Sequence, residues 1–416
     1  MTEQAKVPAI RFAGFADPWE QRKFGDCFEF LKSNTLSRAG LNGENGTARN
    51  VHYGDILIKF GDCLDGERSD LPFITDDTVL PKFAGSILRE GDVIFADTAE
   101  DEAAGKCVEL RKLPKEPTIS GLHTIPARPR FFFGTGYLGH YLNSDAYHRQ
   151  LLPLMQGIKV ISVSKAALQD TQVRFPGLSE QAAIGAALSE IDNLITLHQR
   201  KYDKLVILKK SMLEKMFPKD GESVPEIRFA GFTDPWEQRK ASEVFQIVDD
   251  RGHPTLPVLS ATQNQGMIYR DDSGRYIGHD ESNEIGYKRV LPGDFVVHLR
   301  SFQGGFAHSQ YEGITSPAYT VFRAKEPTSH SDRFWKHWFM SEHFIAGLST
   351  VTYGIRDGRS ISVDEFMNTF LAFPAVEEQA AISRLFDYLD DLITLHQRKL
   401  ELLQNIKKSL LDKMFV

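Results

Sequence analysis

Two blocks of sequence each occur twice in this 416-residue chain, and together they frame two stretches that do not repeat. Residues 10–23 read I-R-F-A-G-F-A-D-P-W-E-Q-R-K, and residues 227–240 match them at thirteen of fourteen positions. Residues 176–217 and 374–415 share P-x-x-x-E-Q-A-A-I, then L-I-T-L-H-Q-R-K, and a final K-M-F. Repeats on this scale indicate that one structural module has been duplicated.

The stretches between the blocks have diverged. Residues 24–175 and 241–373 differ in length and share only weak landmarks, such as G-D-V-I against G-D-F-V and the later I-S-V in each copy. The sequence therefore predicts two related domains framed by common connectors. The expected division is a first domain, a first long helix, a second domain and a second long helix, over residues 1–175, 176–217, 218–373 and 374–416.

Each connector carries apolar residues at steps of three and four, which is typical of a coiled-coil seam. Each begins after a proline, with acidic residues in the first turn and lysines later, as the helix dipole favours. We expect the seam to bind the other helix or a partner protein through Ile184, Leu188, Ile191, Ile195, His198, Tyr202, Leu205, Ile382, Phe386, Leu389, Ile393, His396, Leu400 and Leu403. His198 and His396 are interpreted as packed seam residues that fix register.

A helix of about 38 residues is roughly 57 Å long. Two such helices, each with a narrow apolar stripe, would bury their stripes against each other. The order domain, helix, domain, helix lets them run antiparallel. The predicted fold is α/β (α+β): two mixed α/β domains separated by two long antiparallel coiled-coil helices, with pseudo-twofold symmetry.

The intervals are rich in short β-like runs broken by glycine and proline, which predicts a sheet with some helix in each domain. Several of their loops combine basic, amide and aromatic side chains. Arginine and glutamine pair with guanine and adenine edges, so such loops suit contacts with DNA. The candidate contact residues are Arg300, Ser301, Gln303, Tyr353, Arg356 and Arg359 in the second domain, and Arg128, Arg130, Thr135, Tyr137 and His140 in the first.

Motifs for catalysis and for metal binding are missing. The sequence has no G-x-x-x-x-G-K-[ST], no H-E-x-x-H, no G-x-S-x-G and no Asn-Pro pair of the kind that adenine methyltransferases carry. Its three cysteines form no C-x-x-C pair and no disulfide framework. These features favour a binding protein without catalytic, metal or cofactor sites. Without a signal peptide or an apolar span, we expect a cytoplasmic location and no membrane contact.

The order and duplication of these motifs resemble the specificity subunits of bacterial type I restriction-modification systems. R-F-x-G-F before D-P-W-E-Q-R-K, G-D-V-I-F, P-x-x-x-E-Q-x-x-I and L-I-T-L-H-Q-R-K carry the resemblance, and it extends over nearly the whole chain. It implies that each variable domain is a target-recognition domain for one half of a bipartite sequence in double-stranded DNA. It also implies that the helices set the spacing and bind two methyltransferase subunits, and that the assembly can recruit restriction subunits. S-adenosylmethionine, ATP and magnesium would then belong to the partner subunits.

The net charge of −7 is the main argument against a chain that binds DNA alone, because DNA affinity depends on neutralising phosphates. A basic face or a basic partner would overcome it. The alternative function is a two-headed coiled-coil adaptor that bridges protein partners without nucleic acid. A nuclease or methyltransferase in its own right is disfavoured by the missing motifs.

Overall fold

The computed structural model describes residues 7–67, 70–219, 221–262, 265–274, 281–297, 306–348, 352–353 and 360–416. The chain divides into two compact units. Unit 1 comprises Met1–Gln199 and Arg398–Val416, and unit 2 comprises Arg200–Gln397. Each unit therefore contains one mixed domain, the first part of one long helix and the last part of the other. Among the described residues, no helix combines the length and the apolar character that crossing a bilayer requires.

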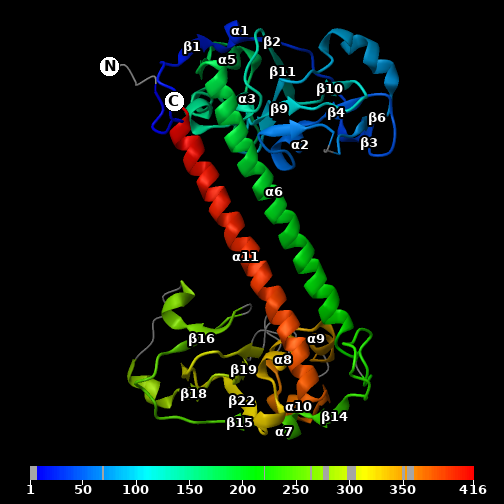
Figure 1. Ribbon diagram of the computed structural model, residues 1–416, viewed down its shortest axis with the longest axis vertical. Coiled ribbons are helices and arrows are strands. Elements are labelled where there is room, and N and C mark those ends of the chain that lie inside the picture. The colour runs from blue at the N-terminus through cyan, green and yellow to red at the C-terminus, as the bar shows by residue number, and fades with distance from the viewer. Residues whose placement is uncertain are drawn as a thin grey trace. The chain divides into compact units, whose positions relative to one another are not determined.

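The two long helices, labelled in Figure 1, are α6 (Leu178–Lys215) and α11 (Val376–Met414). Both start two residues after a proline, at Pro176 and Pro374, whose fixed φ and missing N–H suit the approach to a helix start. Lys215 and Lys413 lie in the last turns, where a positive charge is favourable, and Pro218 follows the end of α6. The long-helix prediction is confirmed, and the mixed α/β fold class with it.

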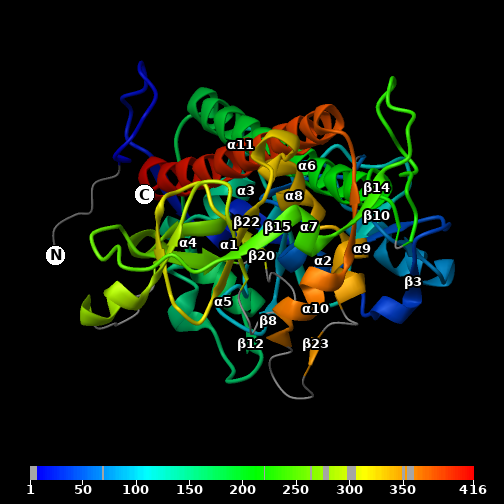
Figure 2. The same cartoon turned by 90° about the horizontal axis from the view of Figure 1, so that it is seen from below.

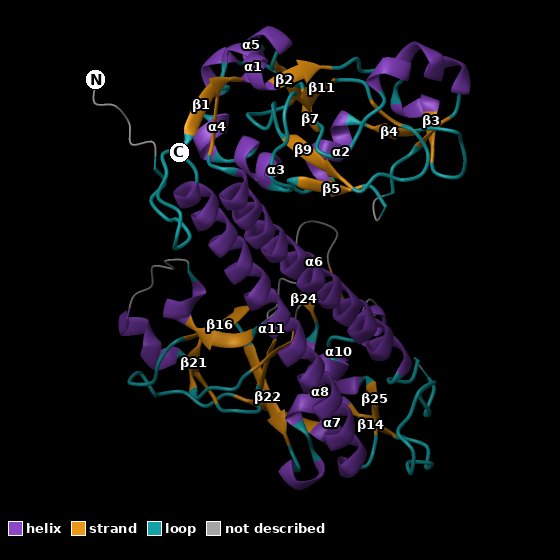
Figure 3. Ribbon diagram, turned by 45° about the horizontal axis from the view of Figure 1, so that its top comes forward, coloured by secondary structure: helices purple, strands orange, loops and turns teal. Residues whose placement is uncertain are grey.

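Unit 1 is built around a sheet in the order β2-β11-β7-β9-β5, visible in Figure 3, and a second sheet in the order β10-β4-β6-β3. Most neighbours are antiparallel, and β5–β9 and β10–β4 are parallel. The strands are β1 Glu20–Lys23, β2 Phe28–Phe30, β3 Leu41–Asn42, β4 Arg49–Val51, β5 Cys63–Asp65, β6 Phe73–Ile74, β7 Val93–Ala96, β8 Thr98–Ala99, β9 Cys107–Arg111, β10 Thr118–Ser120, β11 Thr124–Pro129, β12 Ile161–Ser162 and β13 Gln172–Phe175. The short helices are α1 Phe24–Cys27, α2 Tyr53–Ile58, α3 Tyr137–Leu142, α4 Asp145–His148 and α5 Lys165–Asp170.

Unit 2 has a smaller central sheet in the order β15-β22-β19-β20, all antiparallel. Its strands are β14 Glu237–Lys240, β15 Phe245–Val248, β16 Leu259–Thr262, β17 Gly266–Tyr269, β18 Lys288–Val290, β19 Phe295–Val297, β20 Phe306–His308, β21 Gly313–Thr315, β22 Thr320–Ala324, β23 Thr352–Tyr353, β24 Ser360–Ile361 and β25 Phe370–Phe373. Its short helices are α7 Ala241–Val244, α8 Asp332–Trp338, α9 Glu342–Leu348 and α10 Val363–Asn368.

The weak landmarks of the sequence are equivalent turns. Gly91 (φ +86°) and Gly293 (φ +91°) adopt left-handed backbone before β7 and β19, which glycine tolerates without a Cβ clash. The aspartate that follows each glycine is buried and accepts a backbone N–H three residues earlier, at 2.8 Å for Asp92 and 2.7 Å for Asp294. The G-D pair thus caps a turn and starts a buried strand in both domains.

Candidate functional site

The first repeated block fastens the mixed domain to the start of a long helix. In unit 1 the Arg11 guanidinium donates two hydrogen bonds to Glu180 in the first turn of α6, at 2.6 and 2.7 Å, and a third to the carbonyl of Asp17. The Glu180 side chain is 2% exposed. Charge-assisted bidentate pairs of this kind fix geometry strongly. The E-Q-R-K end of the block forms β1, which pairs antiparallel with β13 directly before the helix.

Unit 2 repeats this clamp with equivalent residues. Arg228 donates to both oxygens of Glu378 in α11, at 2.6 and 2.7 Å, and to the carbonyl of Asp234. The indole N–H of Trp236 adds a third bond to Glu378, at 3.0 Å. Strand β14 pairs with β25 as β1 pairs with β13. The repeated E-Q at the helix start is therefore a docking point for the repeated arginine.

The glutamine of each E-Q pair connects the helix start to the domain beside it. The amide of Gln181 donates to the carbonyl of Pro176 and accepts from the N–H of Gly134. Gln379 donates to Pro374 and accepts from Ser331 in the same way. Both side chains are buried, and the contacts explain why this dipeptide recurs although the domains differ.

At the end of each long helix, the methionine and phenylalanine of the K-M-F sequence insert into a hydrophobic core. In unit 2, Phe217 stacks on Phe386 of α11 with centroids 5.7 Å apart, and meets Phe334 and Trp338 edge-on. In unit 1, Phe415 meets Trp19, Tyr137 and Tyr141 edge-on. Backbone bonds from Ile10 to Lys413 and from Ile227 to Lys215 close both ends equivalently.

Within each unit the two helical segments run antiparallel. In unit 1, Asp192 of α6 pairs with Lys407 of α11, whereas Ile184 shares a core with Phe415. In unit 2, Asp390 of α11 pairs with Lys209 of α6, and Ile382 shares a core with Phe217. In both units, a position nearer the start of one helix lies against a position nearer the end of the other, as antiparallel packing requires.

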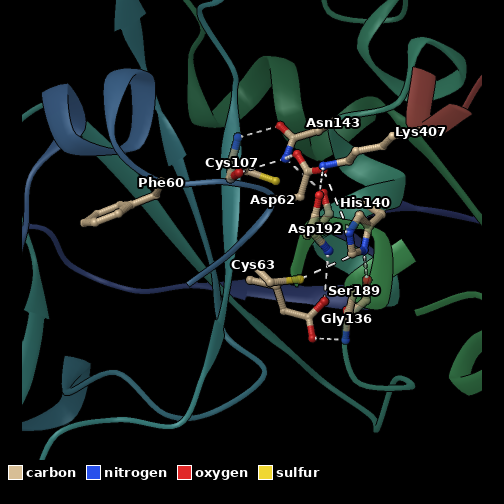
Figure 4. Close-up of polar contacts among 12 residues, drawn as sticks. Phe60, Asp62, Cys63, Cys107, Gly136, His140, Asn143, Ser189, Asp192 and Lys407 are labelled. Carbon is tan, nitrogen blue, oxygen red and sulfur yellow. Dashed lines mark hydrogen bonds and ion pairs between the residues drawn. The ribbon is translucent and has the colours of Figure 1, made fainter. Parts of the chain in front are cut away.

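A buried ion cluster joins these segments to the first domain (Figure 4). The Lys407 ammonium lies 2.5 Å from Asp192 and 2.7 Å from Asp62, which precedes β5. His140 of α3 donates from Nε2 to Asp192 at 2.9 Å, and its Nδ1 lies 2.5 Å from the Gly136 carbonyl. Asp62, His140 and Asp192 have spacing that could hold a metal ion. Lys407 already neutralises both carboxylates, and both imidazole nitrogens face acceptors, so the group acts as an ion-pair cluster.

The geometry of His140 predicts a pH dependence. Burial opposes protonation, but the bond to Asp192 and the contacts with Cys63 and Asp62 outweigh it and raise the His140 pKa from 6.5 to about 10. A raised pKa in the folded state contributes stability that is complete below pH 6.5 and is lost as the pH rises towards 10. We therefore expect the resistance of unit 1 to unfolding by urea to decline between pH 6.5 and 10, as measured by hydrogen exchange. The His140→Gln variant should lose most of this decline.

His337 of α8 provides the contrasting control in unit 2. It hydrogen-bonds Asp387 at 3.2 Å, but its Nδ1 has no partner among the residues that the structure describes, and burial lowers its pKa. Its contribution is therefore lost as the pH falls below 6.5. If the stability of unit 1 changed with pH equally little in the wild type and in His140→Gln, the charged state assigned to His140 would be wrong.

The structure corrects three of the predicted DNA contacts in the first domain. Tyr137 and His140 are fully buried, and the Tyr137 hydroxyl donates to the carbonyl of Arg174. They are covered because α3 packs closely on α6. The contact is so close that a Cβ at Gly185 of α6 would lie 2.3 Å from the Thr135 carbonyl, just before α3. Arg128 donates to both oxygens of Asp92, at 2.9 and 2.7 Å, as Arg323 does to Asp294 in unit 2. Arg128 is therefore a structural residue.

The other candidate DNA contacts stay predictions. Arg130 and Thr135 are exposed. Tyr353 belongs to the short strand β23, and its side chain is not described. The residues that lie outside the described part of the chain are Arg300, Ser301, Gln303, Arg356 and Arg359.

The predicted seam is most deeply buried where each helix starts. Ile184, Leu188, Ile382, Phe386 and Leu389 are at most 4% exposed. The remaining seam residues are partly buried: Ile191, Ile195, His198, Tyr202, Leu205, Ile393, His396, Leu400 and Leu403. The helix-dipole pattern placed Glu378, Lys209 and Lys407 in turns where their charges are favourable, but no sequence pattern predicted the partners of these residues or of Arg11 and Arg228. All five lie inside the repeated blocks, and their recurrence as charged residues was the signal that could have identified them.

Comparisons with known proteins agree with this architecture, although no protein-family model matches the chain. A specificity subunit of Methanocaldococcus jannaschii named for the restriction enzyme MjaX is 20% identical over 95% of this chain and 92% of its own. The type I restriction enzyme MjaVIII specificity subunit of the same archaeon is 25% identical over 62% of this chain and 64% of its own.

A solved structure shares the fold. The S subunit of a type I restriction-modification system from M. genitalium covers 99% of both chains with a TM-score of 0.57 and 10% identity. The duplicated clamps, the long helices and these relatives lead to one conclusion: over nearly its whole length, the chain is a homologue of the specificity subunits of type I restriction enzymes.

Proposed function

We propose that this chain selects the DNA sequence on which a type I restriction-modification complex acts, and performs no chemistry itself. One observation carries the proposal: equivalent clamps, Arg11–Glu180 and Arg228–Glu378, hold two domains that share a central four-strand order but differ around it, since the first sheet adds β5 and is accompanied by a second sheet, β10-β4-β6-β3. A common scaffold with dissimilar heads suits a reader of two different half-sites. A symmetric reader would favour a palindrome, because protein symmetry mirrors the symmetry of the DNA site.

In this proposal the long helices set the spacing between the two half-sites. Their starts are tied to one domain by a buried carboxylate, and their ends are tied to a core by a phenylalanine. Exposed apolar side chains remain along them, among them Leu197, Ile207, Leu395 and Leu402. These positions support helices that carry two methyltransferase subunits, which would transfer methyl groups from S-adenosylmethionine to adenine. ATP and magnesium would act on restriction subunits.

The acidic chain depends on its partners for DNA affinity. A net charge of −7 repels the phosphate backbone unless basic surfaces of other subunits enclose the duplex. Exposed Arg130 and Thr135 remain proposed contacts in the first domain. In the second domain the proposed contacts are Arg300, Ser301, Gln303, Tyr353, Arg356 and Arg359.

Mapping of methylated adenine by long-read sequencing tests the proposal. The chain is expressed with its neighbouring methyltransferase, and the control strain lacks only this chain. We expect an asymmetric methylated sequence of two separated parts that disappears in the control. Methylation that is the same in both strains would contradict the proposal.

The salt dependence of DNA binding by the purified complex separates this function from that of a protein adaptor. Phosphate contacts release counterions, so a DNA reader loses affinity steeply between 50 and 200 mM salt, by about a thousandfold or more for six contacts. A complex that binds the duplex at no salt concentration would instead favour the adaptor.

A further inference from the structure

A short hairpin over residues 155–162 projects from the first domain. Gln156 and Ser162 exchange backbone hydrogen bonds at 3.0 and 2.8 Å. Gly157 makes the turn with φ +120°, and a Cβ at this position would lie 1.8 Å from the Val160 carbonyl oxygen. Only glycine fits there. A single backbone pair, Gln156 with Ser162, closes the hairpin, and residues 157–160 form its tip.

The hairpin is held firmly at its base. Leu151 before it and Val163 after it are buried in the core of unit 1. Strand β12 pairs with β8, and Val163 donates to the carbonyl of Asp97 at 2.8 Å. Figure 2 shows β12 and β8 at the lower edge of the view, well away from α3, which packs on α6. The hairpin therefore leaves the domain on the side away from the helical segments.

The tip exposes apolar side chains beside a positive charge. Ile158 is 98% exposed, more than any other large hydrophobic residue in the described part of the chain, and Val160 is 55% exposed. Lys159 between them is also exposed. Residues 149–169 include Arg149, Lys159 and Lys165 but no aspartate or glutamate, although acidic residues outnumber basic ones in the chain as a whole. A rigid apolar tip without negative charge can approach a polyanion.

The second domain has a similar tripeptide, G-I-R in place of G-I-K, before its own I-S-V motif, although it lies three residues further from that motif. Gly354-Ile355-Arg356 precedes Ile361-Ser362-Val363 as Gly157-Ile158-Lys159 precedes Ile161-Ser162-Val163. Residues 354–359 lie outside the described part of the chain, and β23 and β24 on either side of them pair antiparallel. A glycine-isoleucine-basic tripeptide thus recurs in the sequence where most of the two domains has diverged.

From these features we propose that the 155–162 hairpin enters the major groove of the half-site read by the first domain, with Ile158 packed on a thymine methyl group and Lys159 beside a phosphate. The major groove admits a two-stranded ribbon and presents that methyl to apolar side chains. Burial against it removes Ile158 from water. The inference rests on the DNA recognition proposed above.

The test is a double-mutant cycle that combines a substitution in the protein with a base replacement in the DNA. The full complex with its methyltransferase is bound to a duplex carrying the mapped site, and each thymine is replaced in turn by deoxyuridine, which lacks only the methyl group. We expect one replacement to weaken wild-type binding about fourfold, the effect of one buried methyl. Ile158→Ser should be insensitive to that replacement, and Lys159→Gln should reduce the slope of log affinity against log salt by about one.

Ile58→Ser is the matched control, because Ile58 is 86% exposed in α2 of the same domain. It should respond to every deoxyuridine as the wild type does. Equal responses of wild type and Ile158→Ser at all thymines would overturn the hairpin assignment while leaving DNA recognition intact. A wild-type complex without sequence-specific binding would overturn both proposals.

Discussion

Replacing Arg11 with alanine is expected to lower the free energy of unfolding of unit 1 by about 3–5 kcal/mol. The reason is that the Glu180 carboxylate would stay buried without its partner. Glu180 is 2% exposed and receives two hydrogen bonds from Arg11, so the substitution strands a buried charge at the start of α6. Hydrogen exchange measured by mass spectrometry in increasing urea reports unit 1 and unit 2 separately. Unit 1 should open at lower urea, and unit 2 should change little.

Arg149→Ala is the control for this substitution. Arg149 also forms an ion pair, with Asp145 at 2.9 Å, but the two side chains are 75% and 61% exposed. Solvent screens such a pair, so its loss should cost less than about 1 kcal/mol. If Arg11→Ala and Arg149→Ala lowered the free energy of unfolding equally, the Arg11–Glu180 pair would not hold the domain to the helix.

Phe217→Ala should have a comparable effect in unit 2, about 3–5 kcal/mol. Phe217 is 1% exposed and fills the space between Phe386, Phe334 and Trp338, so its removal leaves a cavity where α6 ends. The same exchange experiment should show earlier opening of unit 2. If the chain selects DNA as proposed, chain-dependent adenine methylation should also fall at elevated temperature, because unit 2 would unfold sooner.

The matched control is Phe370→Ala, since Phe370 is 64% exposed in β25 of the same unit. It loses little buried surface and should cost less than about 1 kcal/mol. A Phe217→Ala variant as stable as Phe370→Ala would mean that the helix end is not anchored by its phenylalanine.

Local pattern explains why the long helices could be predicted and the contact residues could not. Periodic apolar residues over 38 positions specify a helix regardless of its surroundings, and α6 and α11 begin and end close to the predicted limits. Tyr137 and His140 lie in a glycine-containing segment that resembles a surface loop. Their burial arises from the packing of α3 on α6, which lies about 50 residues further along the chain.

The sequence by itself determined the duplicated plan, the helices and the mixed character of the domains, because repeats and periodicity are properties of neighbouring residues. Only the tertiary structure decided which charges are structural. Arg11, Arg128 and Lys407 each find a buried carboxylate through long-range packing, at sequence separations from 36 to 345 residues that follow from their numbering. Burial makes an unpaired charge costly, so the fold selects these partners, and a sequence pattern alone does not distinguish them from solvated side chains.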